Sequence, residues 1–170
     1  MKPEVAAGRG PGLRLETYFA GRAKAWGIFE DRFGTLRRQF EIDVEGSWDG
    51  KTLTLVEDFT YDDGRTERRT WLIDTVGAHG YRGRADGVIG FAEGSASGNL
   101  LSWRYRFSLE VGARTWSVRF DDRLFLQGDD ILINRAAVTK LGVLIGQVTC
   151  VFRKLPAAGA GGRSIATAAR

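Results

Sequence analysis

The chain has 170 residues, of which 43% are hydrophobic and 27% charged, and its formal net charge is +4. This length fits a single domain with a sizeable core. The arginines are scattered among acids without a basic run or a nucleic-acid motif, so we predict that the protein does not bind nucleic acid. Because the only cysteine is Cys150, an intrachain disulfide is excluded.

The sequence shows no membrane-targeting pattern. No apolar run approaches the roughly 20 residues of a transmembrane helix, and residues 1–16 lack the apolar segment of a signal peptide. We therefore expect no transmembrane segment and, by default, a cytoplasmic protein. The pattern carries no information on oligomeric state.

Two tails flank one patterned region. Residues 1–12 are rich in glycine and proline and residues 156–170 are small and polar, so both are predicted to be disordered. Residues 13–155 are predicted to form one β-barrel domain, with a short helical turn at 13–19. Within this domain, alternating segments are separated by turn signals about every 10 residues, which is typical of all-β proteins.

The strand pattern predicts an antiparallel up-and-down meander of about 8–10 strands. We expect a first strand at residues 23–33, one or two glycine-rich strands at 81–98, and a closing strand at 141–154. A meander of this length closes into a lipocalin-like β-barrel because closure removes exposed edges. A barrel of about 8 strands has room for one small ligand.

Turn chemistry predicts which side chains face one another. An Asp-Gly turn at residues 49–50 places Arg38 opposite Tyr61, and a three-residue Asp-Asp-Gly loop at 62–64 follows the next strand. The longer loop is preferred because it keeps the apolar side chains of both strands on one face.

Two further turns, each of type II′ with glycine at the first central position, predict the register around Asp122. A turn at residues 112–113 pairs Trp103 with Asp122, and a turn at 128–129 pairs Asp122 with Arg135. Asp122 and Arg135 are therefore expected to face each other inside the barrel.

The inner face is thus predicted to carry charges. Glu57 lies opposite Arg69, just as Asp122 lies opposite Arg135, and pairing is expected because an unpaired buried charge is costly. Arg38 also points inward, either to an internal acid such as Glu67 or to an anionic ligand, whose carboxylate an arginine can bind with two hydrogen bonds. All these charges could instead form one internal structural network.

Four stretches carry a resemblance to a known family. They are AWGIFEDRFG (25–34), FTYDDGRTERRTW (59–71), GRADGVIGFAEGSASGN (83–99) and FDDRLF with INRA (120–136). Together they resemble a bacterial family of domains of unknown function, many of whose members are named as lipoproteins. The resemblance implies no activity. It implies membrane anchoring through a lipidated N-terminal cysteine, whereas the cysteine of this chain is Cys150, and it leaves envelope association open.

The chain also resembles lipocalin-like, or calycin, barrels more weakly. Those barrels place a tryptophan of the first strand under an arginine from the end of the barrel. Trp26 and Arg153 match these two positions and would stack as a cation–π pair. This resemblance implies architecture only, because fold does not determine function.

Catalytic signatures are missing from the sequence. The single histidine, His79, excludes a histidine-rich metal site and is expected in a solvated loop, while Cys150 is expected to be a buried, unreactive thiol. We predict no metal, cofactor or catalytic site, although Asp-Asp turns at residues 62–63 and 129–130 could bind Ca²⁺ weakly.

We therefore predict a binding protein for a small apolar or amphipathic, acidic molecule. The candidate ligand-binding residues are Arg38, Glu57, Arg69, Trp71, Trp103, Tyr105, Asp122 and Arg135. The alternatives are a packed structural or interaction protein without a ligand, and a hydrolase or isomerase that uses Glu57 or Asp122 as general base. We disfavour the enzyme because an arginine partner lowers the pKa of an acid.

Overall fold

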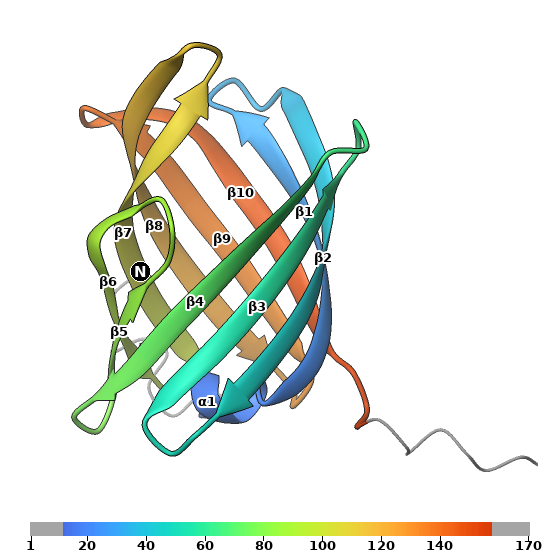
Figure 1. Cartoon of the computed structure of the whole chain (residues 1–170), viewed down its shortest axis with the longest axis vertical. Helices are drawn as coiled ribbons and strands as arrows, with labels where there is room; N and C mark the ends of the chain where they lie inside the picture. The colour runs from blue at the N-terminus through green and yellow to red at the C-terminus, as the bar shows by residue number, and fades with distance from the viewer. Residues whose placement is uncertain (1–11, 158–170) are drawn as a thin grey trace, which may run out of the picture.

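Ten antiparallel strands run up and down in chain order and close into a barrel in the computed structural model, which describes residues 12–157 (Figure 1). The strands are β1 (Gly21–Asp31), β2 (Leu36–Trp48), β3 (Thr52–Tyr61), β4 (Thr66–Val76), β5 (Gly80–Arg84), β6 (Val88–Ser97), β7 (Leu100–Val111), β8 (Arg114–Gln127), β9 (Ile131–Lys140) and β10 (Val143–Lys154). The predicted all-β fold class is confirmed. The tails predicted at 1–12 and 156–170 lie almost wholly outside the described residues.

The N-terminal segment closes one end of the barrel. The helical turn expected at residues 13–19 is confirmed as α1 (Leu15–Tyr18), at the bottom of Figure 1. Tyr18 is buried there, and its hydroxyl donates a hydrogen bond to the carbonyl of Asp130 at 2.8 Å. The hydroxyl of Tyr81 donates to Glu16 at 2.6 Å. These bonds attach the segment to β5 and to the β8–β9 loop.

A glycine lets the chain close this end tightly. Gly46 of β2 lies directly against the backbone that follows α1, so that a Cβ at this position would come 1.8 Å from the carbonyl oxygen of Phe19. Phe19 is itself buried and packs edge-to-face against Phe152 of β10. Only glycine leaves room for this approach.

Two of the predicted turns have the expected register. In the loop at residues 62–64, the amide of Tyr61 donates to the carbonyl of Arg65 at 2.9 Å, and Gly64 has a positive φ of 84°. The turn at residues 112–113 pairs Trp103 with Asp122 as predicted. The side chains that these two turns predicted to share one face of the sheet are therefore confirmed to do so.

The register predicted at residues 49–50 is wrong by two residues. Phe40 pairs with Tyr61, so Arg38 lies beyond the end of β3. The reason is that the carboxylate of Asp49 accepts the amides of Lys51 and Thr52 at 2.8 and 2.7 Å, which moves the turn one residue along the chain. A shift of two residues leaves every side chain on its predicted face.

The register predicted at residues 128–129 is wrong by one residue. The loop holds three residues, Gln127 pairs with Ile131, and Asp122 lies opposite Ala136. A shift of one residue turns every side chain of β9 to the other face. Arg135 therefore points outward and is exposed.

The predicted cation–π pair of Trp26 and Arg153 is wrong as well. Trp26 lies on the outer face of β1 opposite Val151, and 45% of its surface is exposed. Arg153 is opposite Lys24 and exposed. The inner positions at the start of β1 belong to the small residues Ala23 and Ala25, which are buried.

No helix within residues 12–157 is both long enough and apolar enough to cross a membrane.

Replacing Gly46 with alanine should loosen the closed end. The added Cβ would overlap the Phe19 carbonyl, which is backbone and cannot rotate away, so we expect Gly46→Ala to lower the free energy of unfolding by about 1–3 kcal/mol. Urea denaturation measures this change. Gly12→Ala is the control, because nothing lies within 4 Å of its added Cβ. Equal stability of the two variants would contradict the close approach.

Candidate functional site: a cavity inside the barrel

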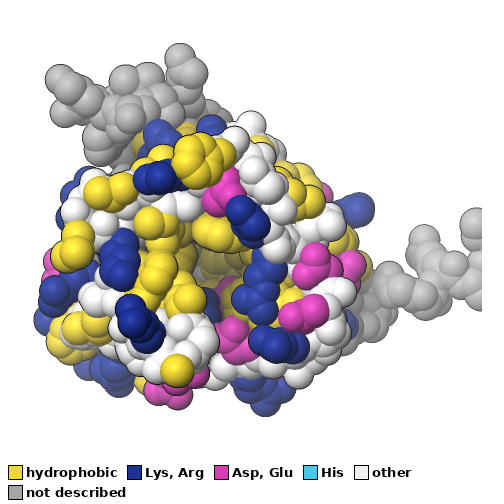
Figure 2. Space-filling view, turned by 90° about the horizontal axis from the view of Figure 1, so that it is seen from above, with side chains coloured by type: hydrophobic (Ala, Val, Ile, Leu, Met, Phe, Trp, Pro, Cys, Tyr) yellow, Lys and Arg dark blue, Asp and Glu magenta, His cyan; other side chains and the backbone are white. Residues whose placement is uncertain are grey.

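The barrel encloses a cavity of about 770 Å³. Leu15 and Phe19 of the N-terminal segment form its floor, and it opens at the opposite end, where Figure 2 shows a hollow framed by hydrophobic and basic side chains. The turns β1–β2, β3–β4, β7–β8 and β9–β10 surround this mouth. The cavity is thus a pocket that reaches from this mouth down to the N-terminal segment.

Small inward residues leave this space unfilled. Ala25 of β1, Ala136 of β9 and Cys150 of β10 are all buried on the inner face. Gly27 follows on β1, and the ring of Phe40 from β2 lies over it, where a Cβ would come 2.3 Å from a ring carbon. Small side chains therefore take up little space in this part of the wall, beside the larger Phe29 of β1 and Phe152 of β10.

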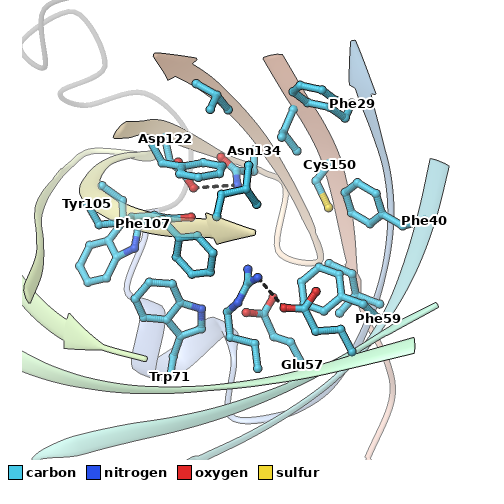
Figure 3. Close-up of a pocket in the computed structure, with 18 of the residues that line it drawn as sticks. Phe29, Phe40, Glu57, Phe59, Trp71, Tyr105, Phe107, Asp122, Asn134 and Cys150 are labelled. Carbon is cyan, nitrogen blue, oxygen red and sulfur yellow. Dashed lines mark hydrogen bonds and ion pairs between the residues drawn. The ribbon is translucent and has the colours of Figure 1, made fainter. Parts of the chain in front are cut away.

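Aromatic rings form the opposite wall. Tyr105 of β7 stacks on Phe120 of β8 with ring centroids 5.0 Å apart and planes 6° apart. Trp71 of β4 meets Tyr105 edge-on at 5.2 Å and Trp103 of β7 at 5.8 Å. These interlocked rings give the pocket a rigid apolar side (Figure 3).

Arg69 belongs to a hydrogen-bonded cluster on the wall. It lies opposite Glu57 as predicted, but its Nη2 donates to Glu67 at 2.9 Å. The other oxygen of Glu67 accepts the hydroxyl of Tyr61 at 2.8 Å. Arg69 therefore has its close ion pair with Glu67, two residues along the same strand.

Glu57 consequently faces the cavity without a close cationic partner. Only 8% of its surface is exposed. Burial raises its pKa to about 7, and this effect outweighs the opposing influence of the Arg69 charge and the Trp71 indole. The carboxyl is poised to change its protonation state near neutral pH.

Asp122 has a different partner from the predicted one. Asn134 of β9 takes the inner position expected for Arg135, and its Nδ2 donates to Asp122 Oδ2 at 3.2 Å (Figure 3). The Oδ1 atoms of both residues are buried and have no hydrogen-bond partner among residues 12–157. The wall thus contains two acceptor oxygens without donors, one on each of two neighbouring strands.

The pKa of Asp122 is also raised to about 7. Burial is the main cause, the hydrogen bond from Asn134 opposes it, and the negative charge of Glu57 adds to it. Our prediction that arginine partners lower the pKa of both acids is therefore wrong, because desolvation dominates and no guanidinium lies against either carboxyl.

Arg38 stands at the mouth of the cavity. Its guanidinium carbon lies 3.8 Å from the centre of the Tyr61 ring, a cation–π contact. The neighbouring Arg37 is bound to Asp31 at 2.7 Å, whereas among the described residues no acid lies within 4.0 Å of Arg38. The predicted contact between Arg38 and Glu67 does not form, since Glu67 is engaged by Arg69 and Tyr61.

The structure brings most of the predicted site residues together. Those that line the cavity are Arg38, Glu57, Arg69, Trp71, Trp103, Tyr105 and Asp122. Arg135 lies on the outside, and Asn134 is the residue that sequence reasoning missed. Their roles in ligand binding stay predictions.

The remaining candidates lie as expected. Cys150 is buried in the cavity wall, and burial raises the pKa of its thiol. His79 is exposed in the turn between β4 and β5. Within residues 12–157, no group of three or more His, Cys, Asp or Glu side chains is arranged to hold a metal ion.

A family model described as "Protein of unknown function (DUF3833)" matches residues 1–154. The chain belongs to this family. The predicted membership of a family of unknown function is confirmed, and lipoprotein anchoring stays a prediction. No curated protein matches the sequence.

A solved structure resembles this DUF3833 protein in fold. The S-type phycobiliprotein lyase CPES from Guillardia theta superimposes with a TM-score of 0.57 at 7% identity, over 92% of this chain and 99% of the lyase. EF1p2_mFAP2b bound to DFHBI gives a TM-score of 0.46 at 11% identity, over 84% and 98% of the chains. The likeness to the lyase shows the fold and nothing further.

The two buried acids predict an unusual pH dependence of stability. Both pKa values are higher in the folded barrel than the ordinary 4.5 of Glu and 3.8 of Asp. Between about pH 5 and pH 8 the folded state holds more protons than the unfolded chain, so the free energy of unfolding falls as the pH rises. We expect a loss of at least about 1 kcal/mol.

Urea denaturation at pH 5 and pH 8 measures this slope. The double variant Glu57→Gln/Asp122→Asn should show a much flatter dependence, because it keeps the shapes of both side chains and removes their titration. A wild-type barrel as stable at pH 8 as at pH 5 would contradict the raised pKa values.

Proposed function

We propose that this protein binds one small, predominantly apolar molecule inside its barrel. The observation that carries the proposal is the cavity of about 770 Å³ that opens at the end of the barrel opposite the N-terminal segment. Ligand pockets occupy about 300–1,000 Å³ and combine an apolar lining with a few convergent polar groups. The aromatic wall around Trp71 and the polar side chains Glu57 and Asp122 match this description.

The polarity along the cavity suggests how such a molecule would lie. The lower wall is apolar, with Leu55, Leu124 and Phe152 above the floor, and suits a hydrocarbon or aromatic body. Arg38 at the mouth has no acid against it and is suited to a carboxylate that ends there. An amphipathic acid would thus enter with its apolar end first.

The same volume argues against a fully packed structural barrel. Protein interiors are close-packed, with few voids larger than a water molecule. Forming a large void without an occupant sacrifices packing contacts along its whole lining. A cavity of this size is therefore better explained by a ligand than by a structural role alone.

An enzyme is the second candidate. Glu57 and Asp122 both have a pKa of about 7 in an accessible cavity, and general acid–base catalysis is most efficient when the pKa lies near the working pH. These raised pKa values support catalysis on the bound molecule, whereas the sequence disfavoured an enzyme because it predicted lowered pKa values. Turnover that Glu57→Gln or Asp122→Asn abolishes, without loss of binding, would establish it.

Titration with 11-(dansylamino)undecanoic acid tests binding directly. We expect a saturable rise in dansyl fluorescence with one site per chain, because the apolar wall shields the probe from water. Cys150→Trp should weaken binding at least about tenfold, since the indole would occupy the cavity. Val151→Trp is the matched control, because Val151 lies on the outer face of the same strand and its replacement should leave the affinity unchanged.

Thermal melts establish that both variants fold. A wild-type protein that does not bind the probe and carries no ligand by native mass spectrometry would contradict the proposed function. Equal binding by wild type and a folded Cys150→Trp variant would place the probe outside the barrel.

A further inference from the structure

The polar pair in the cavity wall lacks hydrogen-bond donors. Asn134 donates a hydrogen bond from Nδ2 to Asp122 Oδ2 at 3.2 Å, and the remaining oxygen of each side chain is buried without a partner in the described part of the chain. Above its pKa of about 7, Asp122 is ionised and only accepts hydrogen bonds, as the amide oxygen of Asn134 does at any pH. In this state the pair lacks donors, and the lack concerns one oxygen of each side chain.

The surrounding protein does not supply these donors. Arg69 is bound to Glu67 at 2.9 Å, and Arg135, which would have neutralised Asp122, points outward. The Tyr105 hydroxyl makes no hydrogen bond to either free oxygen. Glu57, the other buried acid, adds negative charge to the surroundings of Asp122.

Leaving acceptors unpaired in this way is costly. A buried polar atom without a partner loses the hydrogen bonds that it makes to water in the unfolded chain. Native proteins pair nearly all such atoms, and an exception calls for an explanation. Both side chains line the cavity, although the two oxygens themselves are covered. A donor on a molecule inside the barrel therefore meets these oxygens when the side chains turn toward the cavity.

We propose that Asp122 and Asn134 form a subsite for a hydrogen-bond donor, a hydroxyl or an ammonium group, carried on the predominantly apolar body of the ligand. This inference rests on the proposed function and adds the chemistry of the ligand to it. The donor group occupies the space beside the two free oxygens, and the apolar body lies along Leu124 and Phe120 on the same strand. A molecule that offers only acceptors leaves the pair unsatisfied.

The site should consequently select against ligands without a donor. A site built to hydrogen-bond a ligand group rejects the analogue that lacks it far more strongly than an apolar pocket rejects a missing methylene. Hydrogen bonds to charged groups are also stronger than those between neutral groups. The preference is expected to be about tenfold or more.

Displacement of the dansyl probe at pH 8, where Asp122 is mostly ionised, measures this preference. The competitors are decan-1-ol, the decylammonium ion and 1-methoxynonane, which have similar length but differ in their donors. We expect at least one of the two donor compounds to displace the probe at about tenfold lower concentration than the ether. Whichever of the two is stronger identifies the donor as neutral or cationic.

Two variants test whether the preference for a donor depends on Asp122 and Asn134. Asp122→Leu and Asn134→Leu each remove one free oxygen and should bring the affinity for the preferred donor compound close to that of the ether. Asp121→Asn is the matched control, because it changes the adjacent acid, which lies on the outer face near Arg104 and Arg119. This control should keep the wild-type preference.

The results separate this inference from the proposed function. Equal displacement by all three compounds from wild-type protein that binds the probe would overturn the donor subsite and leave the binding function standing. An undiminished preference in both folded leucine variants would overturn it too. Failure of the probe to bind at all would overturn both proposals.

Discussion

Closure of ten strands into one barrel is the constraint on which the rest of the structure depends. The diameter of a barrel grows with its number of strands, and about eight already give an interior that side chains just fill. Here small inward residues such as Ala25 and Ala136 occupy part of the wall, and α1 closes only one end. A cavity follows, and the polar side chains within it face space where a packed core would supply partners.

The fold was predictable because local turn chemistry and side-chain alternation agree. The loop at 62–64 and the turn at 112–113 fix the faces of two strand pairs, β3–β4 and β7–β8, through glycines with positive φ. The errors occurred where a turn is specified by side-chain bonds, as at Asp49, or where alternation is uninformative. Strand β9 begins Ile-Leu-Ile, so its apolar pattern does not indicate which set faces inward, and only the three-residue loop at 128–130 decides.

Most residues that line the site could be predicted from the sequence, but their partners and pKa values could not. The turn predicted at 128–129 placed Arg135 opposite Asp122, yet the observed register puts Asn134 on the inner face and leaves acceptors without donors. Arg69 lies opposite Glu57 but binds Glu67, since a neighbour on the same face was nearer. Sequence reasoning treats opposite charges as partners, whereas the pKa of a buried acid depends on which groups lie within contact distance. Both acids consequently titrate near pH 7.

A crystal structure of the protein grown with the preferred donor compound tests this account most directly. The account predicts one molecule inside the barrel, its body against the wall of Trp71 and Phe120, with its donor atom about 3 Å from the free oxygen of Asp122. A barrel whose interior is filled by its own side chains, or a molecule bound only to the outer surface, would contradict it.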